Sequence, residues 1–244
     1  MSLIQTLARA PVHTIEDAIA IMAAIDERLP DSDGLKWFNR LYLRVTVSVG
    51  NAVGNARFAD VAFMTKLDVV FANLYFAALA AAATDAAAAP SAWRPLLRAR
   101  NASGIARIQF ALAGMNAHIN RDLPDGIVQS FLALGGDPIT DDRREKDFDS
   151  VNDILERVEQ EVKTEFTVGL VGAVDRLGGP LDDAVAMWKV RSARSAAWTN
   201  AQVLWGLRGH PRLRDRFFSR LDGLVGMAGR GLLVPRDPAI LRSG

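Results

Sequence analysis

A histidine and an aspartate four residues apart, His118 and Asp122, carry the clearest potential for chemistry in this sequence. On a helix this spacing puts both side chains on one face. The carboxylate would then fix the imidazole tautomer and make an acid–base couple. Two other interpretations fit the same residues: a structural pair in which Asp122 caps the helix that follows, or two ligands of a divalent metal, which would need at least a third.

Four polar residues could complete a site around this pair. Asn116 and Asn120 lie on the same predicted helix, and their amides could hold a substrate carbonyl or join neighbouring helices. Asp68 and Tyr75 lie one heptad apart on the preceding apolar helix. If that helix packs on the first, Asp68 and Tyr75 could face His118, although helical spacing alone does not fix the rotation. Asp68 would then join the chemistry, and Tyr75 would contact the substrate.

A row of tryptophans later in the chain gives a second candidate surface. Trp188, Trp198 and Trp205 share one side of a predicted helix with Arg191, and Arg194 follows closely. These residues could wall an apolar pocket in which an arginine meets an anion or stacks on an indole. The alternative is that the indoles are core residues, as in most helices with such a row.

The composition excludes several classes of function. The chain has 244 residues, 50% of them hydrophobic, and a formal net charge of +1, so it lacks the basic surplus expected of a nucleic-acid-binding protein. Cysteine is absent, which excludes thiol catalysis, disulfides and iron–sulfur clusters and fits a reducing cytoplasm. The first residues lack a signal-peptide pattern. The most apolar stretch, 69–83, is shorter than the roughly 20 residues of a membrane span, so we expect none.

Periodicity predicts an all-α protein, a single domain of roughly eight helices around a buried helix at about 104–122. That helix is apolar nearly all round, with only Arg107 and Arg121 expected to point outward, and Pro124 should end or kink it. Charged residues at 139–150 predict a solvated stretch, and spaced glycines after 222 predict a tail. The remaining helices are expected at 15–29, 35–53, 60–84, 92–100, 126–134, 148–171, 181–207 and 213–227.

The stretch 114–124, Gly-Met-Asn-Ala-His-Ile-Asn-Arg-Asp-Leu-Pro, resembles an uncharacterised family of bacterial all-helical proteins. Segments 71–75 and 197–202 are also similar to that family. The resemblance would cover most of the chain, but it implies no activity. The His-x-x-x-Asp spacing is in addition similar to part of the pattern of zinc phospholipase C and P1 nuclease. This chain has three histidines, too few for the trinuclear zinc site of those enzymes.

These observations favour an enzyme with a mostly apolar internal pocket for a small, largely apolar molecule. His118 would act as general acid or base, oriented by Asp122, in a cyclisation, isomerisation or hydrolysis. No cofactor is required by this hypothesis. The alternatives are a helical protein that binds a small hydrophobic ligand without chemistry, and a metal-dependent hydrolase with the metal at His118 and Asp122. The oligomeric state and the substrate are not predictable from these residues.

Overall fold

A computed structural model describes residues 6–7, 9–85, 87–168 and 190–235 of the chain. Within these residues every regular element is a helix and no β-strand occurs, which confirms the predicted all-α bundle. The elements in chain order are α2 (Ile15–Arg28), α3 (Gly34–Gly54), α4 (Val61–Thr84), α5 (Arg94–Ala99), α6 (Arg107–Ala117), η1 (His118–Asp122), α7 (Leu123–Leu134), α8 (Asp142–Val168), α10 (Val190–Gly206) and α11 (Pro211–Leu232).

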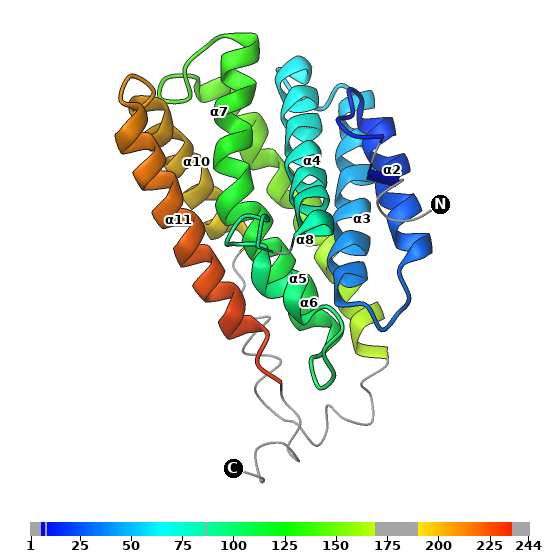
Figure 1. Cartoon of the computed structure of the whole chain (residues 1–244). Helices are drawn as coiled ribbons and strands as arrows, with labels where there is room; N and C mark the ends of the chain where they lie inside the picture. Colours follow the sequence, from blue (N-terminus) through cyan, green and yellow to red (C-terminus); the bar gives the residue numbers. More distant parts are fainter. Residues whose placement is uncertain (1–5, 8, 86, 169–189, 236–244) are drawn as a thin grey trace.

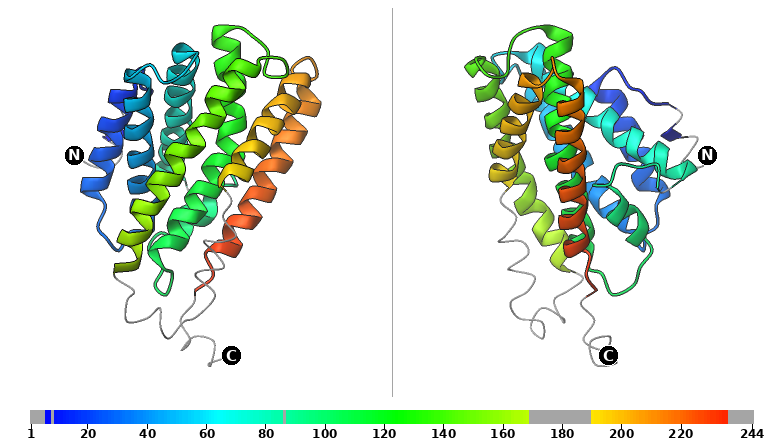
Figure 2. Two further views of the ribbon diagram at one scale, coloured as in Figure 1. Left: turned by 180° about the vertical axis from the view of Figure 1, so that it is seen from behind. Right: turned by 60° about the vertical axis from the view of Figure 1, so that its left-hand side comes forward.

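The rod formed by α6, η1 and α7 runs through the middle of the bundle (Figure 1). Its lower part packs on α3 and α11, and its upper part packs on α4 and α10. Helices α2, α3 and α4 stand together on one side of the rod, and α10 and α11 stand on the other (Figure 1). Seen from behind, α8 crosses the bundle diagonally (Figure 2), in contact with α3, α4 and α10. The expectation of a buried central helix is therefore confirmed.

The central rod does not stop at Pro124, contrary to the prediction. A π-helical turn, η1, joins α6 to α7 without a break, and the backbone N–H of Leu123 donates to the carbonyl of His118 at its end. Proline lacks an N–H, and in a regular α-helix its ring would crowd the carbonyl four residues earlier. The wide turn lies directly before Pro124, where that conflict would arise. A π-turn inside a helix often marks a functional site, and this one contains both His118 and Asp122.

Two helix ends also differ from the sequence prediction. Helix α8 begins at Asp142, inside the stretch predicted to be solvated; that stretch is mostly exposed, but it is helical, and Arg143 and Arg144 both bond to the Asp60 carboxylate. Helix α11 continues to Leu232 through the glycines that suggested a tail. Gly226 is required there, since a Cβ at this position would lie 2.5 Å from the carbonyl oxygen of Ser91.

Several predicted helix starts are confirmed by their caps. The Thr14 hydroxyl accepts a hydrogen bond from the backbone of Asp17 at the start of α2, and Asp60 does the same for Phe63 at the start of α4. The predicted helix at 181–207 is described only from Val190, as α10. Trp188 lies outside the described residues.

Helix α4 is the one described helix that is long and apolar enough to cross a membrane by length and composition, with a mean hydropathy of 1.6. This observation is weak, because the core helix of a globular bundle passes the same test. In this bundle α4 packs against α2, α3, α7 and α8, and it buries Asp68 and Tyr75 in its middle.

Candidate functional site

The Asp122 carboxylate is the hub of the polar network around the π-turn. It is completely buried and accepts hydrogen bonds from three side chains. Nδ1 of His118 and Nε1 of Trp93 each lie 2.9 Å from one carboxylate oxygen, and an Arg121 guanidinium nitrogen lies 2.7 Å from the other. Its side chain therefore does not cap α7, contrary to one part of the structural interpretation, although Asp122 does hold the buried His118. Arg121, expected to point outward, is largely buried between Asp122 and Asp222.

This arrangement fixes the proton on the imidazole of His118. A carboxylate only accepts hydrogen bonds, so Nδ1 carries the proton and Nε2 keeps a free lone pair. Nε2 is buried and has no hydrogen-bond partner among the described residues. Burial lowers the pKa of His118, and the hydrogen bond to Asp122 only partly opposes this effect. The ring is therefore a neutral imidazole whose free nitrogen is able to accept a proton.

Aromatic side chains from two helices and a loop enclose this imidazole. Phe71 of α4 stacks on it, with ring centroids 3.5 Å apart, and Tyr42 of α3 meets it edge-on at 4.5 Å. Phe38, Tyr75 and Trp93 lie farther out, with centroids 5.8 to 6.0 Å away. Such a shell keeps water from the ring and holds its orientation.

A cavity of about 50 Å³ adjoins His118 between α3, α4, η1 and α8. Its lining is apolar apart from Tyr42, Asp68, His118 and Arg194, and three of these four present a buried polar atom without a partner in the described part of the chain. These atoms are the Tyr42 hydroxyl oxygen, one carboxyl oxygen of Asp68 and Nε2 of His118. Buried polar atoms are nearly always hydrogen-bonded, so three unpaired ones around one cavity call for a polar guest.

Asp68 is the second ionisable group of the cavity. Burial raises its pKa to about 7, so near neutrality a large share of this carboxyl group carries a proton. A protonated carboxyl group can donate a proton and a neutral imidazole can accept one. The cavity therefore combines a candidate acid and a candidate base in one enclosed space.

The other predicted site residues lie elsewhere. The Tyr75 hydroxyl donates to Asn39 and does not line the cavity. Asn116 donates to the Val225 carbonyl and so joins α6 to α11, and Asn120 donates to Asn116 one turn earlier on the same rod. The expectation that these three residues contact a substrate in this cavity is therefore not met. The physical reason is helix rotation, because Tyr75 and Asn116 point to neighbouring helices and Asn120 bonds to Asn116.

The two described tryptophans of the row, Trp198 and Trp205, are core residues rather than a pocket wall. Trp198 is 3% exposed and packs against Phe131 and Phe148, away from the cavity. Arg191, predicted to bind substrate, is exposed and pairs with Glu156 and Asp153 on the surface of α8. Arg194 lies one turn after Arg191 on α10, faces the bundle interior and lines the cavity instead.

Tyr42 was missed as a site residue, because its position in the apolar row of α3 gives no other signal.

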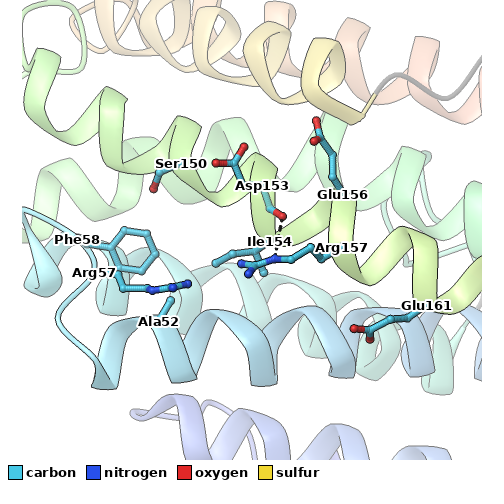
Figure 3. A pocket seen from close by; sticks show the side chains of 9 residues that line it. All are labelled: Ala52, Arg57, Phe58, Ser150, Asp153, Ile154, Glu156, Arg157 and Glu161. Carbon is cyan, nitrogen blue, oxygen red and sulfur yellow. Dashed lines mark hydrogen bonds between the residues drawn. The ribbon is translucent and has the colours of Figure 1, made fainter.

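A larger hollow lies at the surface between the end of α3 and α8 (Figure 3). It measures about 980 Å³ and has charged walls, including Arg57, Arg157 and Glu161. Asp153 and Glu156 are well exposed here and already pair with Arg191. This groove is the solvated outer face of α8, whereas three of the six buried side-chain atoms without a partner in the described residues belong to residues that line the inner cavity.

Among the described residues no group of three histidine, aspartate or glutamate side chains is arranged to hold a metal ion. The His118–Asp122 pair has no third ligand there, and both oxygens of Asp122 already accept hydrogen bonds. The geometry therefore gives no support to the metal-dependent alternative.

Comparison with known proteins supports the resemblance to an uncharacterised family, but not the likeness to the zinc enzymes. The model of a family of unknown function, DUF5995, matches residues 15–235. The chain belongs to this family. No curated protein and no solved structure matches it, so the comparisons add neither an activity nor a likeness to zinc phospholipase C or P1 nuclease.

Proposed function

We propose that this DUF5995 protein is a small-molecule enzyme that moves a proton within the inner cavity, with His118 as general base and Asp68 as general acid. Asp122 is a positioning residue, because it holds the tautomer that leaves Nε2 free. The reaction classes that need only these groups are isomerisation through an enol and hydrolysis of a simple ester or amide.

The observation that carries the proposal is the unpaired Nε2 of His118. This nitrogen is buried at the wall of a cavity while Nδ1 is bonded to a buried carboxylate. A histidine with only a structural role would be expected to satisfy both nitrogens, since an unpaired buried acceptor costs about 1 to 3 kcal/mol. The same cavity also holds the unpaired carboxyl oxygen of Asp68.

The size of the cavity limits the range of possible substrates. At about 50 Å³ it has room for one or two water molecules or a molecule of a few non-hydrogen atoms. Pockets for drug-sized ligands measure roughly 300 to 1,000 Å³. We therefore favour small carbonyl compounds over the large apolar substrates that a cyclisation would need. Among the cavity residues, Val45 and Phe71 are the partly exposed ones, so a guest would enter beside them.

Proton exchange in D₂O tests this proposal without knowledge of the natural substrate. The protein is incubated with a panel of small aldehydes, ketones, keto acids and simple esters, and deuterium incorporation or hydrolysis is followed by NMR. We expect wild-type protein to catalyse exchange or hydrolysis of at least one compound. His118→Gln should abolish that activity and leave Tm within a few degrees.

The matched control is His210→Gln, which removes an exposed imidazole at the start of α11. This variant should keep full activity. Equal activity in the His118→Gln and wild-type proteins would overturn the assignment. Binding of a compound without any exchange or hydrolysis would favour the alternative function, a helical protein that only binds a small ligand.

A further inference from the structure

Arg194 is a buried cation that reaches the cavity from the α10 side. It is 6% exposed, and its guanidinium lies over the ring of Phe148 at 4.0 Å. Nε donates to the Asn152 side chain at 2.9 Å, and one terminal nitrogen donates to the Phe148 carbonyl at 2.6 Å. These contacts fix the guanidinium, but both acceptors are neutral.

The charge of Arg194 therefore has no counterion at hydrogen-bonding distance among the described residues. Burial lowers the pKa of Arg194 to about 9, and the electrostatic effect of Asp149 only partly opposes this. A buried charge without a partner is costly, and arginines in protein interiors are normally paired with an anion. The space beside this guanidinium that could take an anion is the cavity lined by His118 and Asp68.

We propose that Arg194 binds the carboxylate of a small monoanionic substrate and holds it beside His118 in the cavity. This inference rests on the proposed acid–base site and specifies the substrate class for it. A planar guanidinium fork matches a carboxylate in shape and charge. The apolar walls formed by residues such as Met115, Ile119 and Leu155 would contact the short carbon chain of the acid.

The charges around the cavity favour a carboxylate over a phosphate. One guanidinium neutralises one negative charge, and among the described residues no second Lys or Arg lines the cavity. Asp68 faces the same space, and the ionised share of its carboxyl group would repel a dianion more strongly than a monoanion. The small volume of the cavity also favours a carboxylate, because acids of two or three carbons need less room than a phosphate ester.

Binding of simple acids tests the inference directly. Sodium acetate and sodium propionate are titrated into wild-type protein at constant ionic strength, with acetamide, propionamide and inorganic phosphate as comparators. The readouts are Tm and the Cε1–H NMR signal of His118, which is one of three histidines. We expect the two acids to raise Tm and shift this signal, and the amides and phosphate to do neither.

The variants separate recognition from chemistry. Arg194→Gln should weaken acid binding between about tenfold and a hundredfold, the usual range for a lost charged hydrogen bond. Arg194→Lys keeps a positive charge but lacks the planar fork, so its affinity for the acids should lie between those of wild type and Arg194→Gln. It also provides a test if the Arg194→Gln protein does not fold. Arg191→Gln is the matched control, since Arg191 also links α10 to α8 but at the surface, and it should bind like wild type.

Two outcomes overturn the inference: acids that act no better than their amides on the wild type, or equal acid binding by folded Arg194→Gln or Arg194→Lys protein and wild type. The result can be told apart from a failure of the proposed function. His118→Gln should still bind acetate, because Arg194 is unchanged. If the wild type binds acids but catalyses no proton exchange, the catalytic proposal is wrong and the Arg194 inference still holds. If the wild type catalyses proton exchange of neutral ketones but does not bind acids, the Arg194 inference is wrong and the catalytic proposal still holds.

Discussion

The imidazole of His118 lies parallel to the phenyl ring of Phe71, with centroids 3.5 Å apart and an interplanar angle of 5°. His118 is 1% exposed, whereas Phe71 is partly exposed and also lines the cavity. Phe71 thus covers one face of the imidazole while keeping part of its own surface near solvent. The low polarity that depresses the pKa of His118 depends in part on this cover.

Removal of this ring should therefore change the titration of His118. Phe71→Ala exposes the imidazole to water, and we expect the pKa of His118 to rise toward its ordinary value. The loss of packing should destabilise the fold by about 2 kcal/mol, less than for a fully buried phenylalanine. An NMR titration of the His118 ring and urea unfolding measure the two effects. Phe217→Ala on α11 is the control and should leave the titration of His118 unchanged.

Loss of the buried carboxylate should cost more stability than loss of the imidazole it holds. Asp122→Asn leaves Arg121 without its buried charge partner, so we expect the free energy of unfolding to fall by about 3 kcal/mol. It also removes an interaction that raises the pKa of His118, which should fall further. Urea unfolding and histidine NMR give both values. Asp125→Asn, near the surface beside Gln129, should change stability by less than about 1 kcal/mol. Equal losses in the two variants would contradict a special role for Asp122.

Much of the fold could be predicted from the sequence, because amphipathic spacing and caps such as Thr14 and Asp60 act locally. The π-turn could not, since Pro124 alone indicates a helix end. The extension of α11 was also missed, because spaced glycines suggest a loop. The close approach of the Ser91 backbone explains why a helical residue of α11 is a glycine at position 226, and this tertiary contact leaves no mark on local spacing.

The candidate site could be predicted only where one helix determines it. The contact between His118 and Asp122 follows from their spacing on a single helix. The location of Asp68 at the same cavity depends on how α4 is rotated, which the sequence left open. Arg191 and Arg194 have equal claims in the sequence, and only the packing of α10 on α8 directs Arg194 inward and Arg191 outward.

The glycines of α11 offer a test of that packing. Gly226→Ala would place its Cβ 2.5 Å from the carbonyl oxygen of Ser91, so α11 must shift, at a cost of about 1 to 3 kcal/mol. Gly223→Ala, three residues earlier, meets nothing within 4 Å and should stabilise the helix by up to about 1 kcal/mol. Urea unfolding of both variants checks this, and a stable Gly226→Ala protein would mean that α11 does not pack on Ser91.

The pH dependence of stability provides a test of Asp68 that needs no substrate. Its pKa is about 7 in the folded protein and near 3.9 in an unfolded chain, so between these values only the folded state binds the proton. The unfolding free energy contributed by this group therefore decreases as pH rises from about 4 to about 7, and it is constant above that. The slope should be about 1.4 kcal/mol per pH unit, or about 4 kcal/mol in total.

Asp68→Asn removes this titration, so the variant should be more stable than wild type at pH 8 and lose the advantage near pH 4. Urea unfolding at half-unit pH steps gives the difference curve between the two proteins. His118 acts in the opposite direction, because its lowered pKa reduces stability as pH falls below about 6.5, but this effect is common to both proteins and cancels in the difference. A flat difference curve between pH 4 and 7 would show that Asp68 titrates normally and is not a protonated acid in the cavity.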